Sequence, residues 1–311
     1  MKADSMLDAV REGGLLAPGK PLVAMLSGGR DSVCLLDVAV RLLGSAAVTA
    51  LHVNYGLRDD AGEDEAHCAA LCERLGVRLE IERPRRPEGP GNLQAWARDA
   101  RYAAAARLAE PRGASIATGH TADDQVETIL YRLASSPSRR ALLGMRSRDG
   151  RLVRPLLPFT REQVTAYCEE RGLAWRDDPT NAELSFARNR VRHGLAAALA
   201  EVHPAAARNV LRTAELLRDE AQVLDELIDA ELEGTNGDRG TIRLERLAEL
   251  PPALRRLVVQ RLADRAAGRP VPGAANHADE VAALRRTGTA MLDLGGGVRA
   301  VVERGVLRAE R

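Results

Sequence analysis

The stretch that decides the fold is PLVAMLSGGRDS (21–32). Its apolar run suits a buried strand, and the helical spacing of apolar residues over 33–43 indicates that a helix follows the loop. Adjacent glycines let the backbone turn sharply and come close to a ligand. The amides at the start of the next helix, together with the helix dipole, favour an anion there. The pattern therefore predicts a strand–loop–helix unit that binds an anion, with two serine hydroxyls as further donors.

The rest of the first half alternates between short apolar runs and helical patterns. Strands are expected over 46–53, 77–82 and 114–118, and helices over 60–75, 92–110 and 121–134. Strands separated by helices pair in parallel through right-handed crossovers. The sequence thus predicts an α/β fold with a doubly wound parallel sheet, whose ligand lies at the carboxyl ends of the strands.

The second half changes to long helical patterns. Helices are expected over 184–199, 204–233, 251–267 and 276–286, and the last residues look like a small hairpin or sheet around a Gly-rich turn. We therefore expect two domains. Residues 1–195 would form the α/β domain, and residues 196–311 a smaller, mainly helical one.

Composition narrows the class of protein. Of 311 residues, 45% are hydrophobic and 29% charged, as in ordinary soluble globular proteins. No apolar run approaches the roughly 20 residues of a membrane span, and the N-terminus lacks the apolar core of a secretory signal. The four cysteines form no disulfide framework and are expected to be buried, reduced thiols of a cytoplasmic protein.

Local charge says more than net charge, which is only +1. Residues 132–192 carry thirteen Arg against seven Asp or Glu. Such an excess is typical of an anion-facing surface. The alternative is a solvated face of mixed charge in a chain that uses Arg almost to the exclusion of Lys.

Three more groups of polar residues fall at or near the predicted ligand edge. Asp31 in the Gly-rich loop is suited to hold Mg²⁺ or to act on a nucleophile. Asp123 and Glu127 are spaced i, i+4 and so share one helix face, where they could bind an ammonium group or Mg²⁺. Arg98 and Arg101, spaced i, i+3, are neighbours on another helix, and one of them could reach a phosphate.

The Gly-rich loop S-G-G-x-D-S resembles that of the PP-loop ATP pyrophosphatases, which cleave ATP between the α and β phosphates. Further blocks follow in the order seen in the tRNA(Ile)-lysidine synthase family: HVNYGLR (52–58), ARDARY (97–102), GHTADDQVET (119–128), and a last block that begins at RPLL (154–157) and ends at RNRVR (188–192). The chain departs from the family pattern at Gln94 and in the loop 134–140. The resemblance is dense over about 20–195.

The resemblance implies an enzyme that uses ATP, Mg²⁺ and free L-lysine to convert the wobble cytidine of a CAU-anticodon tRNA(Ile) into lysidine. Asp31, Asp123 and Arg98 would be catalytic, with Asp31 as the candidate Mg²⁺ ligand. Lysine would be received by Asp123 and Glu127. The residues expected to contact ATP lie in the Gly-rich loop and at two strand ends, and are Ser27, Gly28, Gly29, Arg30, Asp31, Ser32, His52 and His120.

The tRNA is expected to contact five arginines, namely Arg139, Arg140, Arg188, Arg190 and Arg192. No membrane partner is expected, and a homodimer is a candidate assembly. Another PP-loop tRNA-modifying enzyme, such as a cytidine thiolase, is the alternative. That chemistry usually needs paired cysteines, and the sequence has no C-x-x-C. An amidotransferase-type synthetase and a non-enzymatic RNA-binding module are further alternatives, and neither explains acids beside the Gly-rich loop.

Overall fold

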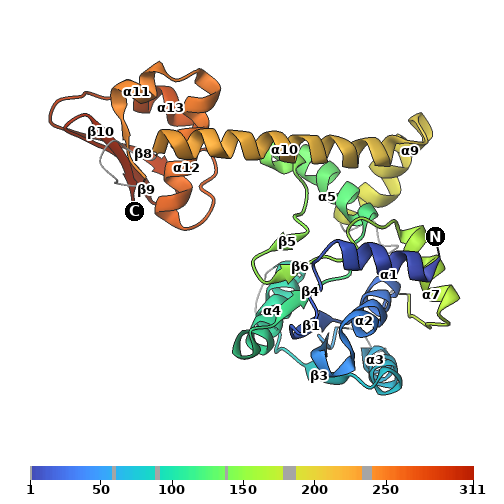
Figure 1. Ribbon diagram of the computed structural model, residues 1–311. Coiled ribbons are helices and arrows are strands. Elements are labelled where there is room, and N and C mark those ends of the chain that lie inside the picture. The colour runs from blue at the N-terminus through green and yellow to red at the C-terminus, as the bar shows by residue number, and fades with distance from the viewer. Residues whose placement is uncertain (1, 58–60, 88–91, 137–138, 178–186, 233–239) are drawn as a thin grey trace. The chain divides into compact units, whose positions relative to one another are not determined.

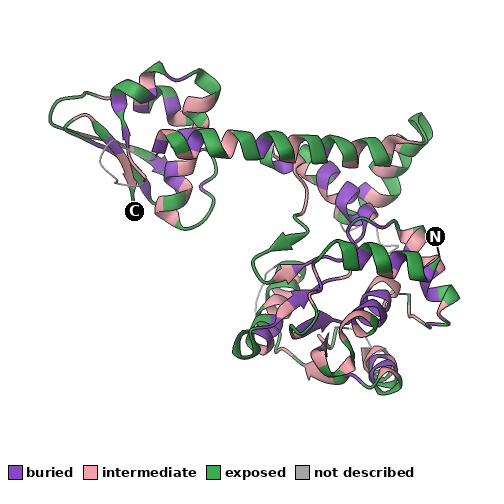
Figure 2. Ribbon diagram, viewed as in Figure 1, coloured by how far each residue is buried: buried purple, intermediate pink, exposed green. Residues whose placement is uncertain are grey.

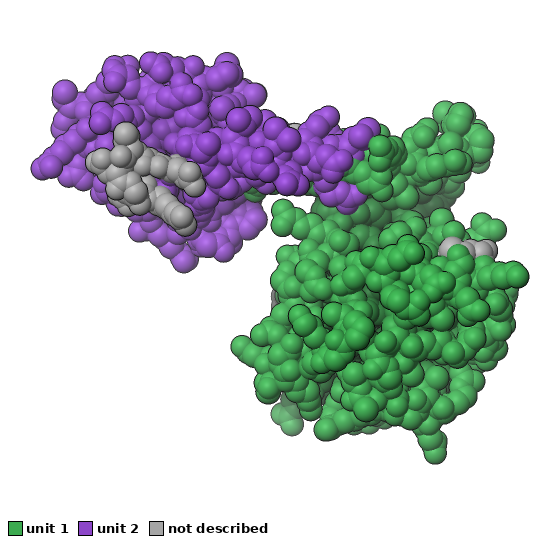
Figure 3. All heavy atoms as spheres, viewed as in Figure 1, with its two compact units in different colours: residues 1–215 green, residues 216–311 purple. Residues whose placement is uncertain are grey.

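The computed structural model describes all residues except 1, 58–60, 88–91, 137–138, 178–186 and 233–239. The chain divides into two compact units, Met1–Glu215 and Leu216–Arg311 (Figure 3). The helix α10 (Ala206–Leu232) belongs partly to each. The division lies beyond residue 195 because the start of α10 and the segments before it pack on the first unit, where Leu211 lies against a small core of Val126, Leu130 and Val191.

A six-stranded sheet forms the centre of unit 1, in the order β3-β2-β1-β4-β6-β5 (Figure 1). The strands are β1 (Leu22–Met25), β2 (Val48–Val53), β3 (Arg78–Glu82), β4 (Ser115–Ala117), β5 (Arg148–Asp149) and β6 (Leu152–Val153). All pairings are parallel except β5 with β6. The predicted doubly wound α/β fold is confirmed. The two-residue strands β5 and β6 were not expected, because so short a run carries no periodicity.

Helices cover both faces of this sheet, and β1 shows why. Its side chains alternate, so Leu22 and Ala24 enter one core while Val23 and Met25 enter the other. All four residues of β1 are buried, as the colouring of the central strands in Figure 2 shows. The first core includes buried residues of α1 (Ala3–Glu12), α2 (Arg30–Leu43), α3 (Ala61–Leu75) and α7 (Arg161–Glu170). The second includes Ala104, Ala105 and Ala109 of α4 (Leu93–Ala109).

The helices α1 and α7 were not expected from the sequence. The start of α7 carries a signal that could have revealed it: the Thr160 hydroxyl accepts from the Gln163 amide at 3.2 Å, and the Gln163 side chain accepts from the Thr160 amide at 2.8 Å. This reciprocal capping box fixes where the helix begins. The helix is then held to α2 by Tyr167, whose hydroxyl donates to the buried Asp37 carboxylate at 2.6 Å.

The helix α5 (Ala122–Ser135) follows β4, and the short α6 (Arg139–Leu142) follows α5. The helix expected over 184–199 is three consecutive pieces, α8 (Ala187–Arg190), a π-helical turn (Val191–Ala196) and α9 (Ala197–Val202). Residues 184–186 lie outside the described part of the chain.

Unit 2 combines helices with an antiparallel sheet ordered β7-β10-β9-β8. Its elements are β7 (Ile242–Arg243), α11 (Leu244–Glu249), α12 (Pro252–Ala267), α13 (Ala278–Ala282), β8 (Thr289–Gly295), β9 (Val298–Glu303) and β10 (Val306–Glu310). Of the small hairpin or sheet expected at the end of the chain, the structure has the sheet, with four antiparallel strands. In the described residues, no helix has the length and apolarity to cross a bilayer.

Candidate active site

The candidate site lies where β1 and β4 end, at the carboxyl edge of the sheet. The helix after β1 packs on one face and the helix before β4 on the other, so this edge is a topological switch point, the place where open α/β sheets bind ligands. The two loops touch through their backbones. A Cβ on Gly119 would lie 2.7 Å from the carbonyl oxygen of Asp31, so only glycine permits this approach.

The Gly-rich loop after β1 is closed by its own serines. The Ser32 hydroxyl donates to the Gly29 carbonyl at 2.8 Å and accepts from the Ser27 amide at 3.1 Å. Gly28 has a φ of +89°, a conformation that favours glycine, and a Cβ there would also lie close to Cys68 Sγ, at 3.3 Å. The structure therefore places the expected nucleotide-contacting residues of this loop together in one compact turn.

Asp31 is the second residue of α2 and is held by its neighbour. Arg30 Nε donates to Asp31 Oδ1 at 3.0 Å. Burial raises the pKa of Asp31, and Arg30 opposes that shift. Mg²⁺ in nucleotide sites is held by one or two carboxylates together with substrate phosphates. Within the described residues no cluster of three ligating side chains exists, so Asp31 fits Mg²⁺ that arrives with ATP rather than a metal caged by protein.

The two histidines expected near ATP have different surroundings. His52 is buried at the end of β2, and its Nδ1 donates to the Leu26 carbonyl at 2.9 Å. It therefore ties β2 to the residue just before the Gly-rich loop. His120 follows β4, and its Nδ1 lies 2.8 Å from the Thr118 hydroxyl. Burial lowers the pKa of His120 to about 4, so the ring is neutral at neutral pH.

Beside His120, three carboxylates of α5 meet three arginines from other segments. We call this group the acid–arginine cluster; it consists of Asp123, Asp124, Glu127, Arg161, Arg188 and Arg192. Arg192 Nε donates to Glu127 Oε1 at 2.6 Å, and Arg188 Nε donates to Glu127 Oε2 at 2.9 Å. Arg161 Nη2 also donates to Glu127 Oε1, at 3.3 Å. Both oxygens of Glu127, whose side chain is only 3% exposed, are therefore occupied.

The other two acids of the cluster differ in their availability. Burial raises the pKa of Asp124, but Arg188 and the Thr121 amide outweigh it and leave the pKa below its usual value. Asp123 is 37% exposed, and its Oδ2 accepts from the Arg161 amide at 2.6 Å. Asp123 is thus the carboxylate of the cluster most open to an incoming ammonium group.

The five arginines expected to contact tRNA do not gather in one place. Arg188 and Arg192 point at the acids just described. Arg190 and Arg140 are exposed on α8 and α6, while the side chain of Arg139 lies outside the described part of the chain. Their role in tRNA binding stays a prediction.

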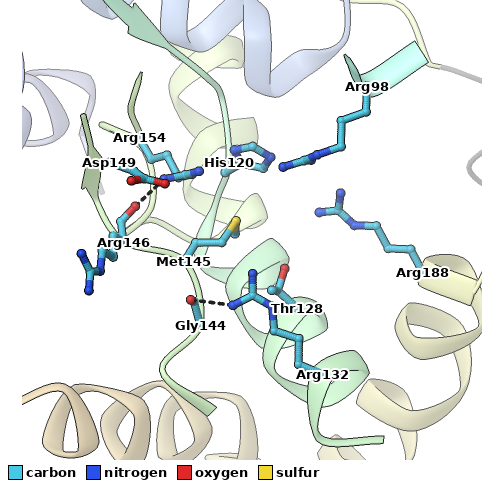
Figure 4. A pocket seen from close by; sticks show the side chains of 10 residues that line it. All are labelled: Arg98, His120, Thr128, Arg132, Gly144, Met145, Arg146, Asp149, Arg154 and Arg188. Atoms are coloured by element: carbon cyan, nitrogen blue, oxygen red, sulfur yellow. Dashed lines mark hydrogen bonds between the residues drawn. The ribbon is translucent and has the colours of Figure 1, made fainter. Parts of the chain in front are cut away.

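A cavity of about 490 Å³ opens next to the acid–arginine cluster. We call it the arginine pocket; its lining is Arg98, His120, Thr128, Arg132, Gly144, Met145, Arg146, Asp149, Arg154 and Arg188 (Figure 4). Arg98 and Arg188 extend toward the pocket from the same side, across from Arg154 and Arg146, and Arg132 rises beside Thr128 (Figure 4). The arginines come from α4, α5, the loop before β5, the end of β6 and α8, so no sequence window contains them.

Arginines in this pocket interact mainly with neutral groups. Arg132 Nη1 donates to the Gly144 carbonyl at 2.8 Å, and Arg154 Nη1 donates to the Arg146 carbonyl at 2.6 Å. The guanidinium carbon of Arg98 lies 4.8 Å from the centre of the Tyr102 ring. In the described part of the chain, no carboxylate forms an ion pair with these guanidinium groups or with that of Arg146. The pocket is therefore a concentration of positive charge, which suits a ligand with several negative charges.

Sequence reasoning named Asp123 and Glu127 but missed Arg161, which contacts both. The missed signal is the T-x-x-Q capping pattern of Thr160 and Gln163, which makes Arg161 the first residue of a helix. It also missed that Arg132 would join Arg98 in one pocket, and no spacing in the sequence indicates this.

The chain is similar to known proteins over most of its length. A family model described as a PP-loop domain matches residues 5–199. A tRNA(Ile)-lysidine synthase of Thermus thermophilus is 42% identical over 82% of this chain and 51% of its own length. That of Symbiobacterium thermophilum is 36% identical over 98% of this chain and 69% of its own length.

The chain spans about half the length of several curated relatives that it matches. Among solved structures, the U34-tRNA thiolase NcsA of Methanococcus maripaludis superposes with a TM-score of 0.58 at 18% identity, covering 69% of this chain and 78% of that one. At that identity the likeness concerns the fold alone.

Proposed function

Because the chain belongs to the tRNA(Ile)-lysidine synthase family, we propose that it ligates lysine onto the wobble cytidine of the tRNA(Ile) that carries a CAU anticodon. ATP first adenylates O2 of the cytosine and pyrophosphate leaves. The ε-amine of free lysine then attacks C2, and AMP leaves. The product tRNA carries lysidine at the wobble position, and its amino-acid specificity changes from methionine to isoleucine.

The observation that carries the proposal is the direct contact between the two loops that the chemistry needs. The Gly119 backbone lies against Asp31, so the nucleotide loop after β1 and the acids after β4 form one site. An adenylating loop beside a carboxylate–arginine cluster suits transfer of an amino acid to an activated base. An ATP-binding domain of another activity has no need for these acids at this place.

In the first step, the closed turn of the Gly-rich loop holds the pyrophosphate portion of ATP. Ser27 and Gly29 supply donors from the loop, as do the first amides of α2, while Ser32 fixes the turn through its own hydrogen bonds. Asp31 would hold Mg²⁺ brought in with the phosphates, and the ion would supply positive charge against the leaving pyrophosphate. Arg98 extends into the adjoining pocket, where it stabilises the negative charge that grows on the α-phosphate.

In the second step, lysine enters the acid–arginine cluster as a zwitterion. Its ammonium groups compete for the carboxylates, and Asp123 is the most accessible of them. The carboxylate of the lysine substrate then pairs with guanidinium groups of the cluster that the protein's own carboxylates have released. The attacking ε-amine must lose a proton from a group whose free pKa is about 10.4, and a carboxylate at hydrogen-bond distance lowers that barrier.

The test is mass spectrometry of nucleosides from a tRNA(Ile) transcript incubated with the protein, ATP, Mg²⁺ and lysine. We expect the wobble cytidine to be replaced by lysidine only when ATP and lysine are both present. Incorporation of sulfur instead of lysine would support the thiolase alternative, and an unchanged transcript would refute ligation by this chain.

Asp31→Asn sharpens the test, because this variant keeps the size of the side chain and removes its charge. We expect lysidine formation and ATP–pyrophosphate exchange to fall below detection while the circular dichroism spectrum and thermal midpoint match those of the parent. A folded variant with full exchange activity would show that Asp31 takes no part in adenylation.

A further inference from the structure

We propose that the arginine pocket binds the RNA backbone, holding at least two phosphates next to the target cytidine, and that it is not part of the site for the pyrophosphate portion of ATP. The choice of RNA as the ligand rests on the proposed function. The positive charge of the pocket and its separation from the Gly-rich loop do not depend on it.

The lining of the pocket carries an excess of positive charge. Arg98, Arg132, Arg146 and Arg154 have no carboxylate at ion-pair distance among the described residues, and Asp149 is the single acid in the lining. With Arg98 assigned to the α-phosphate of ATP, the guanidinium groups of Arg132, Arg146 and Arg154 remain, and a single phosphate diester carries too little negative charge to balance them. Successive diesters of a nucleic-acid strand supply that charge in a row, and arginine forks match their oxygens.

Some buried polar atoms in and near the pocket have no hydrogen-bond partner. Arg154 is only 6% exposed, yet its Nε has no hydrogen-bond partner. The Tyr102 hydroxyl is also buried and unpartnered, and the Tyr102 ring lies under the guanidinium groups of Arg98 and Arg101 at 4.8 and 5.8 Å. A buried cation is costly unless it is compensated. Arg154, which lines the pocket, thus carries a buried charge that no ion pair within the described residues compensates, and an anion bound in the pocket would offset that cost.

The pocket lies beside the acid–arginine cluster, and the Gly-rich loop does not line it. None of residues 27–32 lines the pocket, whereas Thr128 and Arg188 do. Thr128 follows Glu127 along α5, and Arg188 contacts Glu127 directly. A strand bound in the pocket would therefore present a base beside the acid–arginine cluster, where the lysine amine is expected. A wobble cytidine is already single-stranded, so presenting it costs little.

The lining also argues against a second mononucleotide. Among the lining residues, Met145 is the only one with an apolar side chain, and small-molecule pockets are mostly apolar and aromatic with few polar groups. A volume of about 490 Å³ with cationic walls suits a section of backbone better than an adenine ring.

The experiment measures binding of a tRNA(Ile) anticodon stem-loop by filter retention over a series of salt concentrations, without ATP or lysine. Arg132→Gln and Arg146→Gln remove charge from the pocket, and both sites are at least partly exposed. The matched control is Arg151→Gln. Arg151 precedes β6, contacts the Ala114 carbonyl before β4 and does not line the pocket. ATP affinity is measured in parallel by equilibrium dialysis without RNA.

For each pocket variant we expect weaker RNA binding and a salt slope reduced by about 0.7 log units per log salt, the value for one lost phosphate contact on a single strand. The control should keep the parental slope, and all three variants should keep the parental ATP affinity. Unchanged RNA slopes in both pocket variants would overturn the proposal. Loss of ATP affinity with unchanged slopes would reassign the pocket to the nucleotide.

The proposed function can fail separately. If the parent forms no lysidine but the pocket variants lose salt slope, the RNA site stands without the ligation. If the parent forms lysidine and the pocket variants bind RNA as before, ligation stands without this site.

Discussion

The acid–arginine cluster and the arginine pocket lie side by side along α5, and they treat the same residue type in opposite ways. In the cluster, Glu127 alone takes three arginines. In the pocket, Arg132 and Arg154 donate to backbone carbonyls and Arg98 lies over the Tyr102 ring. The comparison teaches that an excess of arginine in a sequence has two meanings. Some of that charge is neutralised by the fold, and only the remainder is available to a ligand.

The largest effect should come from breaking the cluster at its centre with Glu127→Gln. Three guanidinium groups would lose the charge that balances them, so we expect the free energy of unfolding to fall by about 3 kcal/mol, as measured by urea denaturation. Glu169→Gln, an exposed position on α7, is the control and should stay within about 0.5 kcal/mol of the parent.

The same variant tests the role of Glu127 in lysine binding. The KM for lysine should rise more than the KM for ATP, because the nucleotide loop does not contact Glu127. Equal increases in both constants would assign Glu127 a structural role only.

The next effect is a pH dependence of stability that arises from His120, a neutral residue of the pocket lining. His120 has its pKa lowered to about 4 by burial, against about 6.5 in an unfolded chain. Below pH 6.5 the unfolded state takes up the proton first, so stability falls as the pH drops from about 6.5 to 4, by about 3 kcal/mol at most. Chemical denaturation across that range should show the loss, and His120→Gln should flatten it. A variant with the parental pH profile would contradict this origin.

Arg188 belongs both to the acid–arginine cluster and to the lining of the arginine pocket. Arg188→Gln should therefore lower both the stability of the protein and the salt dependence of RNA binding. Two arginines remain at Glu127, which limits the loss of unfolding free energy to about 2 kcal/mol. The salt slope of RNA binding should also fall, by about 0.7. A change in stability with an unchanged slope would place Arg188 in the cluster alone.

The smallest effect should come from Asp149, the one acid of the pocket lining. Asp149→Asn removes a repulsive charge, and we expect RNA binding to tighten about threefold at low salt. The difference should vanish at high salt, because screening acts on an exposed charge. Weaker binding in this variant would mean that Asp149 itself contacts the RNA.

The sequence was sufficient for the nucleotide half of the site and insufficient for the cationic half. The Gly-rich loop is local, so its turn, its serines and Asp31 could be predicted from adjacent residues. Helical spacing likewise put Asp123 and Glu127 on one face. Arg188 meets Glu127 from 61 residues away, and no periodicity reports such a pairing.

The fold shows the same division. Strands of four to six residues with helices between them have a readable pattern, and β1 to β3 were predicted for that reason. The strands β5 and β6 are stabilised by pairing with the end of the sheet rather than by their own residues. The helix α1 was missed although its sequence carries a signal: Ala3, Met6 and Val10 are buried and Leu7 packs beside them, at the i, i+3, i+4, i+7 spacing of an amphipathic helix.

The contact between Gly119 and Asp31 has a consequence for the entropy of the reaction. The two halves of the site are aligned by main chain against main chain, without rotamers that would have to freeze when substrates arrive. Groups whose spacing is fixed before binding lose no freedom at the moment of reaction, and that saving is one of the larger contributions to rate that a protein can make. This alignment depends on direct contact between two segments of main chain. A methyl group at Gly119 would push them apart, and a side-chain substitution elsewhere would not bring them back together.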